Sequence, residues 1–278
     1  MPNTRPSFRW ITIAGLLLAA FVFIPVIVLF TLFVVRENPG PQSLDDAVHS
    51  FRSQSETSVK EPGTTVIRPA AGVYSSVASG TASISFPATS QKYGNVVPVT
   101  VTHTGANCWS TSVDFNSAYQ QRWDYCFDAG YLVENGNYTS TRWDFGVTSI
   151  TNRSSFICQP PGRIMNASED QSEDSTYTCV GTSDSIDGTT TSEVRFTFIG
   201  HEALDIDSAA VPTIHYQEND TLTGTQRGST ITDYWYSVND LLLVRMERHL
   251  ELRTDSPIGD ITYTEVGQWK LASILPNR

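Results

Sequence analysis

The chain has 278 residues, with 18 Lys and Arg against 29 Asp and Glu, so its formal net charge is -11. Proteins that bind nucleic acid usually present a basic face, and this charge therefore argues against a nucleic-acid partner. Hydrophobic residues make up 40% of the chain and aromatic residues 11%, which excludes a wholly disordered protein.

An uncharged run near the N-terminus, residues 10–35, predicts a transmembrane helix. At ~1.5 Å per residue this helix would be about 39 Å long, enough to cross a hydrocarbon core of ~30 Å. The alternative is a cleaved signal peptide, but the apolar part of such a peptide has only ~7–15 residues. The membrane is therefore the first expected partner.

The sequence before this run predicts its orientation. Arg5 and Arg9 precede it, and residues 1–9 contain no acidic residue. Basic residues stay on the cytoplasmic side of a membrane helix, so residues 1–9 should be cytoplasmic. We expect a single-pass protein of the cell membrane, with residues 36–278 outside the cytoplasm.

All four cysteines follow the apolar run: Cys108, Cys126, Cys158 and Cys179. An even number of cysteines in an oxidising compartment indicates two disulfides. A zinc site would instead need close cysteine pairs, which this sequence lacks. Of the possible pairings, Cys108–Cys126 together with Cys158–Cys179 closes the shortest loops, and we expect that one.

Residues 36–65 contain little apolar material and have Pro and Gly near both ends, which is typical of a flexible tether. A short helix from Ser43 is the alternative, because serine is a good N-cap and Asp45 and Asp46 would lie in the first turn. We expect a tether between the membrane segment and a folded extracytoplasmic domain, residues 66–278.

Beyond residue 66 the hydrophobic pattern has a period of two, which predicts β-strands. The clearest example is the segment 244–253, in which Val244 and Leu252 share an apolar face and charged residues occupy the other. Turn sequences such as Asn-Gly and Asp-Gly separate these segments. The predicted fold class is all-β: a single antiparallel curved sheet or a partly open barrel of roughly ten strands.

Arg248 breaks the pattern of its segment, because it falls on the apolar face. A buried guanidinium needs carboxylates or carbonyl groups as hydrogen-bonding partners. We therefore predict that Arg248 has a structural role, as the cation of a buried ion pair.

The sequence carries no recognisable catalytic or metal-binding motif, and we expect no cofactor. His201-Glu202 lacks the second histidine of a zinc-protease motif. The stretch 184–188 lacks the bidentate acid that a calcium loop needs at its last position. His249 alternates with glutamates such as Glu247, which a surface ladder of ion pairs explains.

Tyr and Trp residues gather in the strand-like segments. Such rings can line a groove for a lipid or a glycan, although they more often pack in a core or at the rim of a barrel. The candidates for an aromatic ligand rim are Trp109, Trp123, Trp143, Tyr234, Trp235 and Tyr236.

A series of short motifs spans residues 66–276. In chain order these include Gly72-Val-Tyr74, Phe86-Pro-Ala-Thr89, Arg122-Trp-Asp-Tyr-Cys126, Asp144-Phe-Gly146, Cys158-Gln-Pro-Pro161, Asp233-Tyr-Trp235 and Ser256-Pro-Ile-Gly259. Together they resemble a family of actinobacterial membrane-anchored envelope proteins with an all-β extracytoplasmic domain. The resemblance implies a bacterial surface location and one β domain, and it carries over no catalytic residue.

These observations favour a non-catalytic, membrane-anchored binding or scaffolding module of the bacterial cell envelope. A lipid or other apolar ligand, a glycan, or another envelope protein would be its partner. The alternative is an extracytoplasmic hydrolase built on a β scaffold. A nucleophile and a base within hydrogen-bonding reach in a cleft would favour the hydrolase, whereas an apolar groove without such a pair would favour binding.

Overall fold

The computed structural model describes residues 39–55, 67–146, 148–166, 174–256 and 259–278. Residues 38–143 and 151–278 form one compact unit, which contains a β-barrel. The expected cytoplasmic segment, residues 1–9, and the expected transmembrane helix, residues 10–35, lie outside the described residues. Within the described part, no helix is both long enough and apolar enough to cross a membrane.

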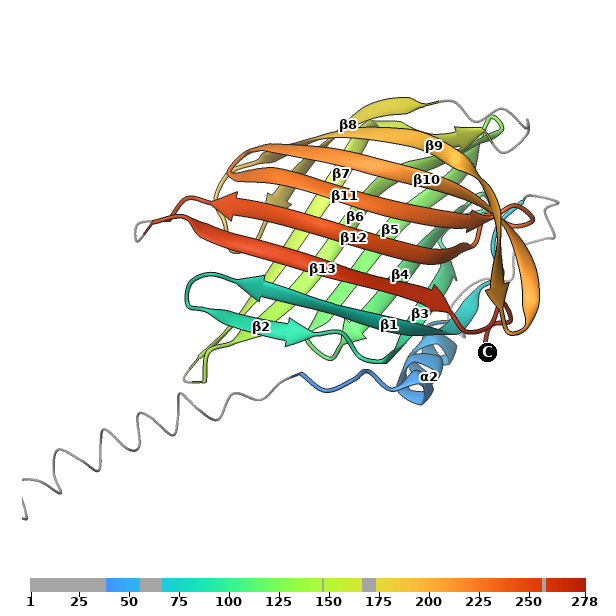
Figure 1. Cartoon of the computed structure of the whole chain (residues 1–278), viewed down its shortest axis with the longest axis horizontal. Coiled ribbons are helices and arrows are strands. Elements are labelled where there is room, and N and C mark those ends of the chain that lie inside the picture. Colours follow the sequence, from blue (N-terminus) through green and yellow to red (C-terminus); the bar gives the residue numbers. More distant parts are fainter. Residues whose placement is uncertain (1–38, 56–66, 147, 167–173, 257–258) are drawn as a thin grey trace, which may run out of the picture. The chain divides into compact units, whose positions relative to one another are not determined.

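Strands make up most of the described chain, as the period-two pattern predicts. They are β1 (Gly72–Ile84), β2 (Thr89–Lys92), β3 (Val96–His103), β4 (Cys108–Asn116), β5 (Tyr119–Asp128), β6 (Tyr131–Asp144), β7 (Ser149–Asn166), β8 (Ser175–Ser183), β9 (Thr190–Ile206), β10 (Ala209–Gly224), β11 (Gln226–Ser237), β12 (Leu243–Thr254) and β13 (Ile261–Leu271). From β3 onward each strand pairs with the next along the chain, in an up-and-down antiparallel order (Figure 1).

The sheet closes into a barrel because β13 pairs with β1. On its other side, β1 pairs with β3 along its first half and with the short β2 along its second half. The barrel wall therefore has twelve strands, with β2 and β3 together filling one position.

This architecture confirms the all-β antiparallel class but corrects the expected open or partly open sheet of roughly ten strands. Closure depends on pairs such as Ser76 with Leu271, which lie opposite each other although they are far apart in the sequence. Local alternation of side chains carries no information about such pairs.

The two disulfides form with the expected local pairing. Cys108–Cys126 links β4 to β5, and Cys158–Cys179 links β7 to β8. In both cases the two cysteines lie directly opposite each other in the register of neighbouring strands. No described cysteine is free.

Replacing both Cys158 and Cys179 with serine should lower the free energy of unfolding by about 2 to 3 kcal/mol, because the disulfide restricts a loop of about 20 residues in the unfolded chain. Denaturant unfolding of the full chain, followed by tryptophan emission, measures this loss. Unchanged stability in the double variant would contradict the prediction.

Inward-pointing side chains fill the two ends of the barrel differently. The end where β11 turns into β12 holds a dense apolar core, whose members include Trp109, Tyr125, Tyr236, Leu243 and Trp269. Toward the end where β12 turns into β13, the inward side chains are more polar and a cavity remains. Interior side chains can fill an eight-stranded barrel, but one of twelve strands is wider.

A helix, α2 (Leu44–Ser55), packs on the outside of the barrel. Ala47 and Val48 are buried against Val73 at the start of β1. The hydroxyl of Ser43 caps the helix by accepting a hydrogen bond from the backbone N–H of Asp46, at 3.4 Å.

The helix corrects part of the expected tether of residues 36–65. The few apolar residues of this segment recur at helical spacing, so that one face of the helix can be buried while the other stays in water. The alternative of a short helix after Ser43 is the one the structure shows. Residues 56–65 of the expected tether lie outside the described residues.

Candidate binding cavity

A cavity of about 300 Å³ lies inside the more polar half of the barrel. Glu218 on β10, Arg248 on β12 and Glu265 on β13 belong to its wall and are buried. Its lining also reaches Thr254 at the end of β12 and the exposed Ser185 between β8 and β9. The mouth of the cavity is therefore at the end of the barrel where β12 turns into β13. The aromatic side chains of its wall are Tyr119, Trp123, Trp143, Phe156, Tyr234 and Tyr263.

Three tyrosine hydroxyls surround the carboxylate of Glu265, which is 1% exposed. Tyr119 and Tyr263 each donate a hydrogen bond to its Oε2 at 2.8 Å, and Tyr93 donates one to Oε1. Burial, followed by the charge of Glu265, raises the pKa of all three hydroxyls well above the ordinary value. They therefore remain protonated and act as donors, which satisfies this buried carboxylate.

Tyr93 lies between β2 and β3, and its side chain is buried in the interior of the barrel. Its ring stacks on Phe115, with 4.2 Å between ring centroids, and lies against the backbone of Gly80 and Gly267. These two glycines are paired across β1 and β13, and a Cβ added at Gly80 would lie 2.6 Å from the ring. Glycine at both positions makes room for the tyrosine that holds Glu265.

Arg248 points into the barrel and is 7% exposed. Its Nε donates to the hydroxyl of Thr232 at 3.2 Å, its Nη2 donates to the hydroxyl of Tyr234 at 3.4 Å, and its Cζ lies 5.7 Å from the ring centroid of Trp123. Burial lowers the pKa of Arg248, but the neighbouring Tyr234 and Glu265 raise it, and the net pKa is well above the ordinary value.

The expected ion pair of Arg248 therefore has a different form. Its direct hydrogen-bond partners are hydroxyl groups, and among the described residues no carboxylate forms a direct salt bridge with it. Glu218 and Glu265 act on it through space instead. Hydroxyl partners keep the guanidinium hydrogen-bonded while the carboxylates share its charge.

Three further acids lie in or beside the cavity. Glu134 on β6 accepts hydrogen bonds from Asn137 at 3.1 Å and from Tyr177 at 3.0 Å, and burial raises its pKa. Burial, and next the charge of Glu134, raise the pKa of Glu218 well above the ordinary value.

Asp220 lies two residues beyond Glu218 on the same face of β10. Burial raises the pKa of Asp220 to about 6, although a hydrogen bond from the Ser192 hydroxyl at 2.7 Å opposes the change. Glu134, Glu218, Asp220 and Glu265 thus share an interior in which Arg248 supplies positive charge. The four carboxyl groups outnumber the single guanidinium, so this part of the barrel should bind either protons or a further cation.

Gln121 on β5 lines the same cavity and is 6% exposed. Its Oε1 is buried and has no hydrogen-bond partner among the described residues. A buried acceptor without a donor costs free energy, and such a group in a native protein needs an explanation.

The predicted aromatic rim separates into three groups. Trp123, Trp143 and Tyr234 line the cavity. Trp109 and Tyr236 instead pack around Tyr125 in the apolar half of the barrel, with ring centroids 6.0 Å and 6.3 Å from that of Tyr125.

Trp235 belongs to the outer face of β11. Its ring stacks on His215, with 4.1 Å between centroids, and the guanidinium of Arg245 lies 4.3 Å from its ring centroid. Its Nε1 donates a hydrogen bond to Glu202. Trp235 therefore lies on the opposite side of the sheet from the cavity.

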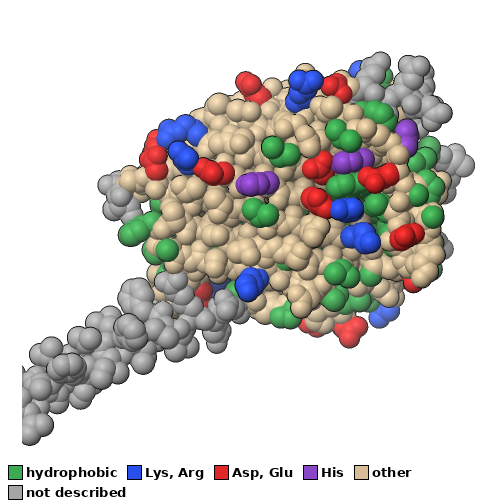
Figure 2. Space-filling view, viewed as in Figure 1, with side chains coloured by type: hydrophobic (Ala, Val, Ile, Leu, Met, Phe, Trp, Pro, Cys, Tyr) green, Lys and Arg blue, Asp and Glu red, His purple; other side chains and the backbone are tan. Residues whose placement is uncertain are grey.

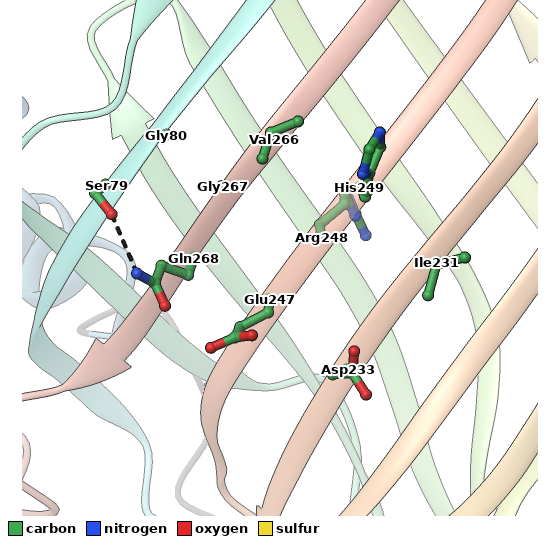
Figure 3. A pocket seen from close by; sticks show the side chains of 10 residues that line it. All are labelled: Ser79, Gly80, Ile231, Asp233, Glu247, Arg248, His249, Val266, Gly267 and Gln268. Atoms are coloured by element: carbon green, nitrogen blue, oxygen red, sulfur yellow. Dashed lines mark hydrogen bonds between the residues drawn. The ribbon is translucent and has the colours of Figure 1, made fainter.

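The outer face of β1, β11, β12 and β13 carries a shallow hollow (Figure 3). Asp233, Glu247 and His249 line it, and Gln268 donates a hydrogen bond to the Ser79 hydroxyl at 3.5 Å. Acidic, basic and histidine side chains are mixed with hydrophobic ones over this face (Figure 2). The described residues include no group of His, Cys, Asp and Glu side chains that could hold a metal ion.

The cavity wall holds a serine hydroxyl within hydrogen-bonding reach of a carboxylate, because Ser192 donates to Asp220 at 2.7 Å. In the described part of the chain, no histidine, cysteine or lysine lines it. What lines it is a mixture of aromatic rings, carboxylates, amides and hydroxyls, with Leu222, Leu250 and Leu252 nearer the mouth. The fold and the cavity together define a closed β-barrel with an internal polar and aromatic pocket.

No protein family matches the sequence, and no curated protein matches it. Among solved structures, the crystal structure of the hypothetical lipoprotein YmcC from Escherichia coli (K12) is similar over 82% of this chain and 97% of that chain. The two sequences are 14% identical in the superposition, and the TM-score is 0.32.

Proposed function

We propose that this chain is a non-catalytic, membrane-anchored binding module of the bacterial cell envelope, whose barrel holds a small ligand in its internal cavity. The cavity itself carries the proposal: about 300 Å³ enclosed by strands, open at one end and lined by rings and convergent polar groups. Pockets of this size and composition are typical of small-molecule sites.

The lining restricts the kind of ligand. A bare acyl chain would offer no donor to the buried Oε1 of Gln121 and no positive charge to Glu218 and Asp220, at a high cost in free energy. The wholly apolar lipid considered from the sequence is therefore a poor fit, and a ligand with a polar group is a better one. A folded protein partner could not enter a cavity of this volume.

The proposed location rests on two features. Disulfides persist in oxidising compartments, which supports a domain outside the cytoplasm. The uncharged run of residues 10–35, preceded by Arg5 and Arg9, supports a single-pass anchor with its N-terminus in the cytoplasm.

A reporter that is active only outside the cytoplasm, fused after Arg278, should be active. The matched control is a reporter that is active only in the cytoplasm, fused at the same residue, which should be silent. The opposite result would contradict the proposed topology.

A cavity-filling substitution tests the binding role. Thr230→Trp places an indole in the wall of the cavity, whereas Ile231→Trp places one on the outer face of the same strand. We expect native mass spectrometry of the full chain, purified from membranes, to detect a bound small molecule in the wild type and in Ile231→Trp but not in Thr230→Trp. Far-UV circular dichroism checks that both variants fold.

Two outcomes would contradict the binding role. One is a wild-type chain that carries no ligand and takes none up from an extract of envelope small molecules. The other is a ligand that Thr230→Trp retains as well as Ile231→Trp does, which would place the ligand outside the cavity.

A further inference from the structure

We infer that the ligand of this cavity is a small organic cation: an ammonium or guanidinium group with N–H donors, attached to an apolar or aromatic body. The inference rests on the proposed binding function and names the class of ligand. Gln121, Glu218 and Asp220 would receive the cationic group.

The first observation is the unpartnered acceptor. Gln121 Oε1 is buried, lines the cavity and lacks a donor among the described residues. Only a group with N–H or O–H bonds can satisfy it. A quaternary ammonium or an acyl chain would leave it unsatisfied, whereas a primary ammonium or a guanidinium would not.

The second observation is the balance of charge. Four carboxyl groups face the interior from β6, β10 and β13, and the guanidinium of Arg248 is the one cation that the described wall of the cavity contains. Tyrosine hydroxyls already hold Glu265, so its charge is the best satisfied. Glu218 and Asp220 line the cavity and keep acceptor capacity for a cation.

The third observation concerns the remaining wall. Trp143 and Tyr263 present aromatic surface, and Leu252 and Ile261 present aliphatic surface near the mouth. Rings of this kind attract a cation over their faces and pack against an apolar body. The wall therefore combines acceptors for a charged group with apolar contacts for what is attached to it.

A metal ion and an anion fit less well. The described residues contain no group of metal-binding side chains. An anion would have to bind at Arg248, whose guanidinium is held by Thr232 and Tyr234, while carboxylates nearby repel the anion.

The test uses the full chain and a series of probes of similar shape. 2-Phenylethylamine, neutral 2-phenylethanol and anionic phenylacetate differ mainly in charge and are titrated by calorimetry at pH 7.5. We expect saturable binding of the amine, with the alcohol and the acid at least about tenfold weaker, as the loss of a charge-assisted hydrogen bond implies. Dodecylamine, used below its aggregation limit, tests whether the natural ligand is a small free amine or an amphiphile with an amine head group. Tighter binding of dodecylamine than of 2-phenylethylamine indicates an amphiphile.

Two variants locate the cationic group. Gln121→Leu removes the unpartnered acceptor, and Asp220→Asn removes a charge while keeping an oxygen for Ser192. Each should weaken binding of the amine by about tenfold. Glu251→Gln, on the outer face of β12, removes the same charge away from the cavity and should leave binding unchanged.

The outcomes separate this inference from the proposed function. If the alcohol or the acid binds as tightly as the amine, and Thr230→Trp abolishes that binding, the cavity is a binding site but does not select a cationic ligand, and the inference fails. If the amine binds equally well to Asp220→Asn, Gln121→Leu and wild type, the assigned residues are wrong and the inference fails. If no probe binds and no ligand co-purifies, both the inference and the binding function fail.

Discussion

Replacing Arg248 with methionine is expected to lower the free energy of unfolding at pH 7 by about 3 to 5 kcal/mol, because the variant leaves buried carboxylates without their compensating charge. Arg248 is buried, and the charges of Glu218 and Glu265 act on it from neighbouring strands. Methionine also removes the hydrogen bonds to Thr232 and Tyr234, so that their hydroxyls need other partners.

Arg253→Met is the matched control, because Arg253 is on the same strand but faces solvent. It pairs with Glu251 at 2.8 Å on the outer face, and such exposed pairs contribute only ~0 to 1 kcal/mol. Urea unfolding of the full chain with both disulfides intact measures the two losses. If Arg248→Met is no less stable than Arg253→Met, Arg248 does not compensate the interior acids.

The double variant Arg248→Met with Glu218→Gln separates charge from packing. If the loss in Arg248→Met comes from uncompensated charge, removing one carboxylate should restore part of it. If the loss comes from packing around the guanidinium, the second substitution should restore nothing. A partial recovery is therefore the result that the charge argument requires.

The inward position of Arg248 could be predicted because the alternation of side chains between the two faces of a strand can be read from the local sequence. In the segment 244–253 apolar and charged residues alternate, and the observed burial follows that alternation. The disulfides could be predicted for a similar reason, since the shortest loops join neighbouring strands. Local regularities of this kind survive in the fold because a strand has only two faces.

The alternation of side chains along β13 would also have predicted that Glu265 points into the barrel. This residue shares a face of β13 with Tyr263, Trp269 and Leu271, an apolar set that indicates an inward position. On β10, Glu218 and Asp220 similarly share a face with Tyr216 and Leu222. The sequence therefore contains a signal for inward acids.

The partners of these acids could not be predicted in this way. Tyr93 and Tyr119 meet Glu265 from positions 172 and 146 residues away in the sequence. Their meeting depends on closure of the barrel and on its register, which are set by the pairing of β1 with β13. The cavity is a product of that closure, and no single segment encodes it.

The six aromatic residues of the predicted rim lie in different places for the same reason. Trp235 and Tyr236 are adjacent, so they point to opposite faces of β11, and a cluster in sequence is not a cluster in space. Trp109 and Trp123 both point inward from neighbouring strands, yet one lies in the apolar core and the other at the cavity. Depth along the barrel separates them, and hydrophobic periodicity does not report depth.

The buried acids also predict that the protein loses stability as pH rises through the range from about 4 to 6. Burial raises the pKa of Asp220 from 3.8 to about 6 and raises the pKa values of Glu134 and Glu218 as well. The folded state then binds more protons than the unfolded chain in this range, so the free energy of unfolding falls as pH rises. Asp220 alone should contribute about 3 kcal/mol to that fall.

Asp220→Asn should remove this contribution, because asparagine keeps the acceptor for Ser192 and cannot ionise. We expect the variant to match the wild type near pH 4 and to exceed its free energy of unfolding by up to about 3 kcal/mol at pH 7.5. Glu134 and Glu218 also have raised pKa values and still titrate in the variant, so the variant should retain part of the slope. Urea unfolding at a series of pH values measures both curves, with Glu251→Gln as the control on the outer face. An Asp220→Asn chain that is less stable than the wild type at pH 7.5 would mean that the Asp220 carboxylate is already stabilised by a cation inside the barrel.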